Sequence, residues 1–242
     1  MSDHANANVI VTVSDCRLRV LPDTDWAFAR RHAGMIKAHW RRRSRDNPAL
    51  FNGIVHLCAG SRVVGGVLEA EYLRTDFASY LYWREHACPD RSIRNAFGAA
   101  LVRAADGALL LCRSGNQTIN AGLVNPPGGF IDVRDVDAAG RIDIAANIAR
   151  ELAEETGLAY DDLVREPGFM LVFDGLLIAI GVAYRSPMPA AALAARVDRF
   201  IACEVDPELA GTVMVASRDA IGAHRMLGYT QSLVRALFPD QA

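Results

Sequence analysis

Apolar and polar residues change their spacing repeatedly along the chain, and each change predicts a new element. Short runs rich in β-branched residues predict strands, at 9–13, 54–58, 62–68, 99–104, 108–112, 168–173, 176–184 and 212–216. Apolar residues at helical spacing predict helices, at 23–45, 75–85, 143–157, 187–200 and 231–238. Asp-Gly pairs at 106–107 and 174–175 predict tight hairpin turns, and Ala59-Gly60 is expected to turn between the second and third strands. This order favours a mixed sheet sandwiched between helices, an α/β (α+β) fold.

The chain divides into two predicted regions at a junction near residues 92–96. Residues 1–95 form an N-terminal companion region, whose strands are expected to make a small sheet of their own. Residues 96–242 form the second region, in which a polar loop at 113–122 leads into a glycine turn. At 242 residues and 51% hydrophobic, the chain has enough apolar material for one large domain or two smaller ones.

Composition and charge exclude several classes of protein. The formal net charge is −2, which argues against a general binder of nucleic acids. The most apolar stretch, 169–184, is short and contains Asp174, so no membrane span is expected. The polar first eight residues lack the layout of a signal peptide. Five widely spaced cysteines without a C-x-x-C pair indicate reduced thiols in a cytoplasmic protein, and neither disulfides nor a zinc site.

A cluster of basic residues lies near the end of the first predicted helix, at Arg41, Arg42, Arg43 and Arg45. One interpretation is a solvated helix end whose positive charges complement the helix dipole. The other is a site for a phosphate or a partner. The first interpretation is favoured, and the second stays open.

The helix predicted between Asp143 and Gly157 has clear ends and a clear inner face. Asp143 is a good N-cap residue, because its side chain accepts hydrogen bonds from the first backbone amides. Gly157 readily takes the left-handed conformation that ends a helix. Between them, Ile144, Ile148 and Leu152 form an apolar stripe for a core.

Three carboxylates project from the opposite face of this helix, at Glu151, Glu154 and Glu155. Their spacing places them within roughly 5–6 Å of one another, where like charges cost about 0.2–0.5 kcal/mol per pair. Arg150 can offset the charge of Glu154, four positions further on, but not all three charges. A divalent cation such as Mg²⁺ explains the cluster, because it prefers oxygen ligands and is commonly shared between carboxylates and substrate phosphates.

Residues 150–158, R-E-L-A-E-E-T-G-L, match the pattern R-E-U-x-E-E-x-G-U, in which U is a bulky apolar residue. This pattern resembles the second half of the Nudix box, the signature of enzymes that hydrolyse a nucleoside diphosphate linked to another group. The Nudix fold that the resemblance implies agrees with the sandwiched mixed sheet.

The first half of the box is present but stretched. The family pattern places a glycine 14 positions before the arginine, whereas Gly129 lies 150 − 129 = 21 positions before Arg150. The 21 − 14 = 7 extra residues predict an inserted loop at about 136–142. Counting forward from Gly129, Asp135 stands where the family has an early glutamate, but counting back from Arg150 gives Ile142. The insertion therefore leaves the role of Asp135 open.

The resemblance implies a catalytic site that uses Mg²⁺ or Mn²⁺. Glu154 and Glu155 would be the main metal ligands, Glu151 would assist, and Arg150 would orient the cluster. The backbone carbonyl of Gly129 would also face a metal, since a glycine turn lets the backbone approach closely.

Sites of this kind often include a further carboxylate outside the box. Glu208, shortly before the strand at 212–216, is the first candidate, and Glu204 is the second. The alternative for Glu208 is a solvated acid on a loop. His56 and His224 have no ligand spacing, and we expect them to be structural.

Scattered matches resemble the UDP-sugar pyrophosphatase branch of the Nudix enzymes, which also has an N-terminal companion region and a stretched box. They lie at 40–42, 47–53, 79–80, 113–114 and 208. The resemblance implies hydrolysis of a UDP-sugar to UMP and a sugar 1-phosphate, with Arg113 and Tyr80 binding the substrate. It leaves a monomer and a homodimer open. Two alternatives remain: an ADP-ribose or dinucleotide pyrophosphatase, and a non-catalytic domain that senses a nucleotide sugar.

Overall fold

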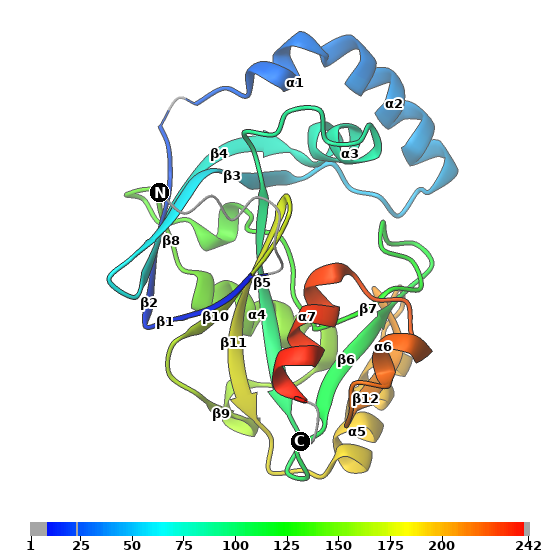
Figure 1. Ribbon diagram of the computed structural model, residues 1–242. Helices are drawn as coiled ribbons and strands as arrows, with labels where there is room; N and C mark the ends of the chain where they lie inside the picture. The colour runs from blue at the N-terminus through cyan, green and yellow to red at the C-terminus, as the bar shows by residue number, and fades with distance from the viewer. Residues whose placement is uncertain (1–8, 23, 240–242) are drawn as a thin grey trace.

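Two β-sheets packed against each other form the centre of the fold (Figure 1). The computed structural model describes residues 9–22 and 24–239. The polar N-terminal octapeptide and Asp23, the expected start of the first helix, lie outside these residues.

The larger sheet has eight strands in the described residues. Its main path runs in the order β1 (Val9–Val13), β10 (Phe169–Asp174), β11 (Leu177–Arg185), β5 (Asn95–Arg103), β6 (Leu109–Ser114) and β12 (Leu209–Val215). β11 and β5 are parallel, and the other neighbours on this path are antiparallel. Two short strands complete the sheet, β7 (Val124–Asn125) beside β6 and β9 (Val164–Arg165) beside β11.

The smaller sheet contains β3 (Ile54–Val64), β4 (Val67–Asp76), β2 (Asp15–Val20) and β8 (Arg141–Ile142), in that order. β2 and β4 are parallel, and the other pairs are antiparallel. On one face Leu68 and Tyr72 pack into the core of the larger sheet. On the other face Leu57 and Leu73 pack with helices. Both faces of this sheet are therefore partly covered.

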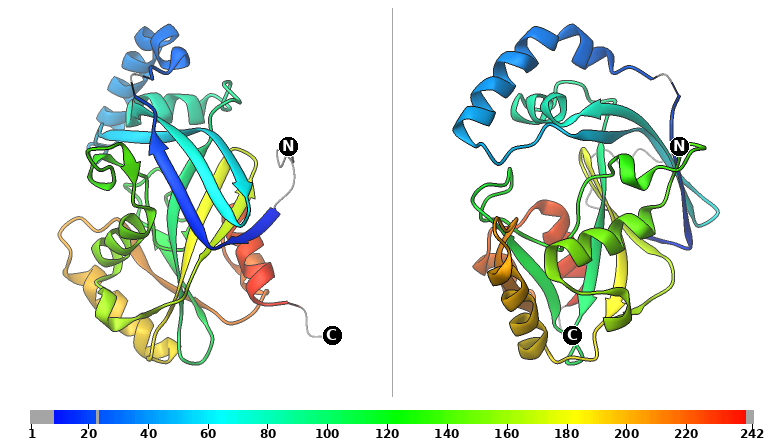
Figure 2. Two further views of the ribbon diagram at one scale, coloured as in Figure 1. Left: turned by 90° about the vertical axis from the view of Figure 1, so that its left-hand side faces the viewer. Right: turned by 180° about the vertical axis from the view of Figure 1, so that it is seen from behind.

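Helices cover both faces of the larger sheet, as the sequence predicts. α4 (Ile144–Thr156) and α5 (Ala190–Cys203) pack on one face, and α6 (Ala220–Ala223) and α7 (Gly228–Leu237) pack on the other. Figure 2 shows α1 (Ala27–Arg31), α2 (Ala33–Asp46) and α3 (Phe77–Glu85) as a layer over the smaller sheet. Short 3₁₀ turns occur at Val133–Asp135 and Tyr160–Asp162. The predicted mixed sheet sandwiched between helices is confirmed.

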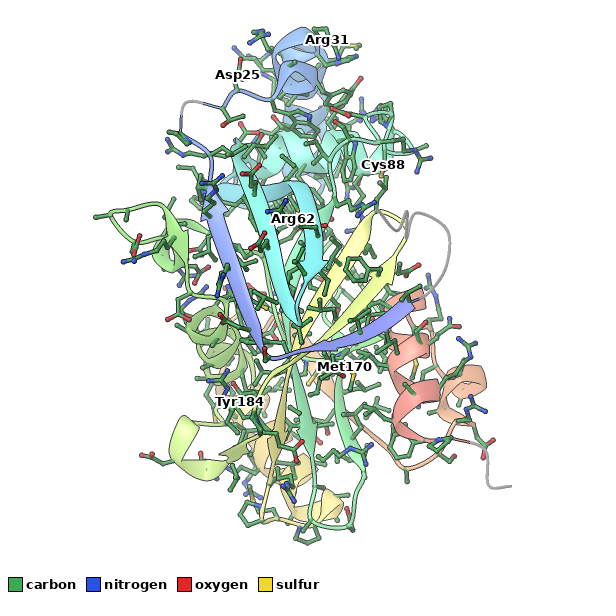
Figure 3. The ribbon with its side chains drawn as sticks, turned by 60° about the vertical axis from the view of Figure 1, so that its left-hand side comes forward. Asp25, Arg31, Arg62, Cys88, Met170 and Tyr184 are labelled. Atoms are coloured by element: carbon green, nitrogen blue, oxygen red, sulfur yellow. The ribbon has the colours of Figure 1, made fainter. Side chains whose placement is uncertain are left out.

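Two strands cross between the predicted regions 1–95 and 96–242. The expectation that the N-terminal strands form a sheet of their own is wrong for β1, which pairs with β10 in the larger sheet, with Thr12 opposite Met170 (Figure 3). In the other direction, β8 joins the smaller sheet beside β2. The strand β2 was not predicted at all. The boundary at 95 and 96 stays a prediction.

Two predicted boundaries inside the first region are wrong. The turn after β3 is at Gly65-Gly66, where both residues have positive φ (57° and 77°), and not at Ala59-Gly60. Residues 59 and 60 lie within β3, at an irregularity between Cys58 and Gly60. The predicted helix 23–45 is two helices, α1 and α2, because the backbone of His32 leaves the helical region (φ −107°, ψ 13°).

In the described residues, no helix combines the length and the apolar character that crossing a membrane requires. All five cysteines are free thiols. The basic cluster on α2 is divided between exposed and paired residues: Arg43 contacts Glu85 at 3.1 Å, whereas Arg41 and Arg42 are exposed.

Candidate active site

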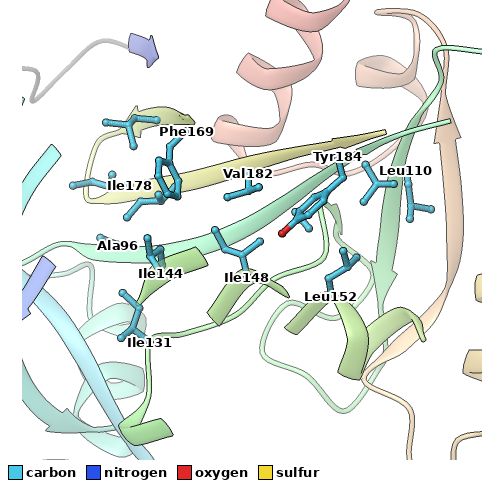
Figure 4. Close-up of a cluster of buried hydrophobic side chains, with 14 of the residues drawn as sticks. Ala96, Leu110, Ile131, Ile144, Ile148, Leu152, Phe169, Ile178, Val182 and Tyr184 are labelled. Carbon is cyan, nitrogen blue, oxygen red and sulfur yellow. The ribbon is translucent and has the colours of Figure 1, made fainter. Parts of the chain in front are cut away.

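The helix α4 has the ends that its sequence predicts. The Asp143 side chain accepts a hydrogen bond from the backbone N–H of Ala146 at 2.9 Å, and Gly157 ends the helix in the left-handed conformation with φ 67°. Figure 4 shows Ile144, Ile148 and Leu152 in a row toward the strands of the larger sheet. The expectation that the glutamates lie on the opposite face is wrong for Glu151 and Glu155, because they follow Ile144 and Ile148 by seven residues, about two turns, and so continue this stripe. The Glu151 side chain is 16% exposed, whereas that of Glu154 is 49% exposed.

The glycine turn is held against β5 by backbone hydrogen bonds. β5 and β6 are in register only at Arg103 and Leu109, beside their turn. Further along β5, the loop takes the place of a neighbouring strand: the N–H of Gly98 bonds to the carbonyl of Gly129 at 3.2 Å, and the N–H of Ala100 bonds to that of Pro127 at 2.8 Å. The turn therefore has a fixed position between the sheet and α4.

Backbone geometry requires glycine at Gly128, whereas a side chain at Gly129 would only displace the end of the Glu151 side chain. Gly128 has φ 151°, and a Cβ atom there would lie 2.9 Å from the Cα of Ala99. A Cβ atom on Gly129 would lie 2.6 Å from the carboxyl carbon of Glu151. The N–H of Gly128 also donates to Glu155 Oε2 at 2.8 Å. The turn thus lies directly against two of the three glutamates.

A pocket of about 250 Å³ brings the predicted carboxylates together. Its lining consists of Glu151, Glu154 and Glu155 from α4, and of Ile201, Glu204, Asp206, Pro207, Glu208 and Leu209 from the end of α5 and the segment before β12. Glu208, predicted on its position before a strand, is therefore in the same pocket as the box glutamates. Its backbone carbonyl accepts a hydrogen bond from the N–H of Gly115 at 2.7 Å, which fixes the segment to the end of β6. Asp206 was missed, although its alternation with Glu204 and Glu208 was visible in the sequence.

Arg150 connects the carboxylates of the box. Its Nη1 lies 2.7 Å from Glu151 and 2.9 Å from Glu154, and its Nη2 lies 3.0 Å from Asp135. Burial acts to lower the pKa of Arg150, but its hydrogen bond to Asp135 and the charges of Glu151, Asp135 and Glu154 raise the pKa above its ordinary value. Arg150 is therefore a permanent cation in contact with three carboxylates, and its role in orienting the cluster stays a prediction.

Asp135 is a buried partner of Arg150. Its side chain is 3% exposed and accepts hydrogen bonds from Arg150, from Asn147 Nδ2 at 2.9 Å and from the N–H of Asp132 at 2.9 Å. The forward count from Gly129 therefore selects a residue that contacts the box, and the role of Asp135 stays open. The N–H of Asp143 bonds to the carbonyl of Asp135 at 3.0 Å, so the two ends of the insertion at 136–142 lie next to each other. The insertion therefore does not disturb the contact between Asp135 and Arg150.

Asn147 was missed by the sequence reasoning. Its side chain is completely buried, and Nδ2 donates to the carbonyl of Phe130 at 3.0 Å as well as to Asp135. The available signal was a polar residue directly before Ile148, on the face of the helix that the apolar stripe buries. Asn147 thus links α4 to the glycine turn.

The predicted inserted loop contains ordered structure. It begins after the 3₁₀ turn Val133–Asp135 and includes β8, and an isolated bridge joins Val136 to Ile142. Arg134 on the 3₁₀ turn reaches back to α4, with Nη1 3.1 Å from Glu154 Oε1. The insertion is therefore a strand-forming excursion that joins the smaller sheet.

The clustered carboxylates perturb one another. Burial raises the pKa of Glu151 to about 7, against the opposing charge of Arg150, and the charges of Glu154 and Asp135 add to the rise. Burial also raises the pKa of Glu155 well above its ordinary value, although the N–H of Gly128 acts to lower it. The charges of Glu151, Glu208 and Glu154 raise it further. The pocket therefore concentrates negative charge in a partly desolvated place, which favours a cation.

The donor atoms fit Mg²⁺ or Mn²⁺ in chemistry, because all of them are oxygens. Their arrangement is not a finished coordination shell: among residues 9–22 and 24–239, no three His, Cys, Asp or Glu side chains converge as metal ligands. The carbonyl of Gly129 accepts the N–H of Gly98, and both oxygens of Glu154 contact arginines. Side chains would have to shift for a cation to bind.

The two predicted substrate-binding residues lie outside the lining of this pocket. Tyr80 on α3 is 3% exposed, and its hydroxyl accepts from Asn95 Nδ2 at 3.3 Å. Its ring centroid is 4.8 Å from that of Phe130, which follows the glycine turn. Arg113, at the end of β6, donates to the carbonyl of Gly122 at 3.4 Å. Their roles in binding stay predictions.

Comparisons with known proteins find similarity only among solved structures. No family model matches the chain, and no curated protein matches it. The solved structures include DR0079 from Deinococcus radiodurans, 17% identical with a TM-score of 0.43, where the match covers 60% of this chain and 83% of that one. A Nudix hydrolase from M. smegmatis is 17% identical with a TM-score of 0.40, over the same shares of the two chains. The MutT protein from Methanosarcina mazei is 19% identical with a TM-score of 0.39, over 60% of this chain and 92% of that one.

Proposed function

We propose that this chain is a Nudix hydrolase that cleaves the diphosphate linkage of a nucleoside diphosphate joined to another group, using Mg²⁺ or Mn²⁺. The observation that carries this proposal is the pocket in which Glu151, Glu154 and Glu155 of α4 meet Glu208 from the segment before β12. Four carboxylates in one small pocket cost folding energy through mutual repulsion and desolvation, and a cation bound with its phosphate ligand offsets that cost.

The chain's own groups have separate tasks in this mechanism. Glu151, Glu154, Glu155 and Glu208 would hold the cation, with the carbonyl of Gly129 beside them. Arg150 and its buried partner Asp135 fix the direction of the helix carboxylates. When bound, the cation neutralises charge on the diphosphate and lowers the pKa of a coordinated water.

We further propose that the substrate is a UDP-sugar, cut to UMP and a sugar 1-phosphate. Selection of the base requires groups outside the box, and the chain has them next to the glycine turn. The half-buried ring of Phe77 lies 5.8 Å from that of Phe130, and both rings pack near Tyr80. The polar loop 113–122 is tied to the N-terminal region by a hydrogen bond of 2.7 Å from Arg84 to Asn120. Together these supply an apolar surface and polar groups with which a nucleobase can be recognised.

The test compares kcat/KM for UDP-glucose, ADP-glucose and ADP-ribose at one Mg²⁺ concentration, with products identified. We expect UDP-glucose to be preferred by at least about tenfold, because a base that leaves buried hydrogen-bonding groups unpaired is rejected. Glu155→Gln is the control, and it should abolish turnover of every substrate while binding of UMP persists.

Other outcomes point to other functions. Faster turnover of ADP-ribose would replace the UDP-sugar with an adenine substrate and leave the hydrolase proposal intact. Tight binding of UDP-glucose without any turnover in Mg²⁺ or Mn²⁺ would indicate a nucleotide-sugar sensor. Full activity in excess EDTA would refute the role of the metal.

A further inference from the structure

Both carboxylate oxygens of Glu154 are occupied by arginines. Oε2 accepts from Arg150 Nη1 at 2.9 Å, as the spacing of four residues along α4 predicts. Oε1 accepts from Arg134 Nη1 at 3.1 Å, and Arg134 belongs to the 3₁₀ turn 20 residues earlier in the chain. A cation that approaches either carboxylate oxygen of Glu154 therefore meets an arginine already bound there.

Asp132 fixes the position of Arg134. Its Nε and Nη2 bond to Asp132 Oδ2 at 2.9 and 2.7 Å, and its backbone N–H bonds to Asp132 Oδ1 at 2.7 Å. Asp132 is itself the N-cap of the 3₁₀ turn. The guanidinium thus remains anchored when its one contact to Glu154 is broken, so the contact can open without unfolding the turn.

A divalent cation and Arg134 compete for the same carboxylate. Both are positive, so a cation that ligates Glu154 Oε1 is repelled by the guanidinium bound there and has to displace it. The Arg134 side chain is 54% exposed and that of Glu154 is 49% exposed. Water therefore screens their attraction, and exchange with a directly bonded cation costs little.

We propose that Arg134 takes the place of the divalent cation at Glu154 in the cation-free protein and sets how tightly the cation binds. This inference rests on the proposed function, since it requires that the pocket binds a divalent cation. Arg134 is here a positioning residue: it holds Glu154 in the pocket and releases it when the cation arrives.

The test measures Mn²⁺ binding to the full chain without substrate, by calorimetry and by electron paramagnetic resonance. Removal of the competitor in Arg134→Gln should tighten Mn²⁺ binding by about two- to fivefold, the upper part of the range expected for an exposed ion pair. Arg134→Lys keeps the charge but loses the forked guanidinium that spans Asp132 and Glu154. Its Mn²⁺ affinity should therefore lie between those of the wild-type chain and Arg134→Gln.

Arg141→Gln is the matched control. Arg141 lies in the excursion that follows the turn of Arg134, has a side chain that is 77% exposed, and pairs with Asp137 at 2.8 Å, outside the lining of the pocket. Arg141→Gln removes one positive charge, as Arg134→Gln does, but far from Glu154. The Mn²⁺ affinity of Arg141→Gln should therefore stay at the wild-type value. In the Glu154→Gln background, Arg134→Gln should have no further effect, because the two side chains act on each other.

Each outcome decides the proposal. Unchanged or weaker Mn²⁺ binding by Arg134→Gln would overturn it while leaving the proposed hydrolase standing. Equal tightening in Arg141→Gln, or an undiminished effect in the Glu154→Gln background, would show that only overall charge matters and would also overturn it. If the wild-type chain binds no Mn²⁺ in this pocket, the proposed function and this inference both fail.

Discussion

Replacing Asp135 by asparagine tests how much of the site depends on one buried charge. The substitution keeps the shape of the side chain but removes its charge and turns one acceptor into an NH₂ donor. Three donors converge on the carboxylate, from Arg150, Asn147 and the backbone of Asp132. At least one of them would face another donor after the substitution.

The expected loss of stability follows from burial. Removing one partner of a fully buried ion pair costs about 3–5 kcal/mol. Arg150 keeps 21% of its side chain exposed and retains Glu151 and Glu154 as partners, so part of its charge stays compensated. We therefore expect a loss of about 2–3 kcal/mol, discounted from the buried value for solvent screening. For a chain of this size that lowers the Tm by roughly 4–12 °C.

The assay combines thermal and urea unfolding, followed by circular dichroism, with kcat/KM on the best substrate. Because Arg150 orients the carboxylates through Asp135, kcat/KM should fall by about 10- to 100-fold, as for other groups that support a metal site. The control is Asp137→Asn. Asp137 lies two residues after Asp135, and its exposed carboxylate pairs with Arg141. If Asp135→Asn is as stable and active as Asp137→Asn, the role given to the buried contact is wrong.

Three further changes test separate parts of the structure. Glu208→Gln should lower kcat at least about tenfold, as loss of a group at the metal site does. It should leave the Tm nearly unchanged, because the Glu208 side chain is exposed. Turnover near the wild-type rate would show that Glu208 is a solvated acid on a loop. Gly157→Ala should cost about 1–3 kcal/mol more in urea unfolding than Gly107→Ala. Both glycines have positive φ, but only at Gly157 would the new Cβ overlap a ring, 2.7 Å from Cγ of Phe200. Equal losses of unfolding free energy in the two variants would contradict this overlap. Burial lowers the pKa of His56, so the folded state resists protonation and stability should fall as the pH drops below about 6.5. His56→Gln should flatten this pH dependence, and an unchanged slope would assign it to other groups.

Local signals predicted much of the candidate site. The side chain of Asp143 and the left-handed backbone of Gly157 cap the two ends of α4, and both caps could be predicted from the residue types alone. The Asp106-Gly107 turn also depends on one residue with positive φ, Gly107 at 87°. The three glutamates and the glycine turn follow from spacing within a short segment. Such features need no knowledge of distant partners.

Features that depend on distant partners could not be predicted. The pairing of β1 with β10 joins segments whose own sequences predict a strand but not its neighbour. Neither β2 nor β8 was predicted as a strand, and the two segments, distant in sequence, pair with each other. The contact of Asp135 with Arg150 was ambiguous because the path of the insertion decides it. The Gly65-Gly66 turn was misplaced because Ala59-Gly60 offered a similar local signal, and only the register of β3 against β4 distinguishes them.

The position of β1 at one edge of the larger sheet also constrains the order of events during synthesis. Val9 pairs with Phe173, so its partner is translated 173 − 9 = 164 residues later. At roughly 5–20 residues per second the delay is about 8–30 s. β2 can pair with β4 much sooner, since Val20 lies opposite Tyr72. During the delay the apolar segment V-I-V-T-V has no neighbour, and such a segment invites pairing with other chains. The segment β1 therefore stays available for such pairing until β10 leaves the ribosome.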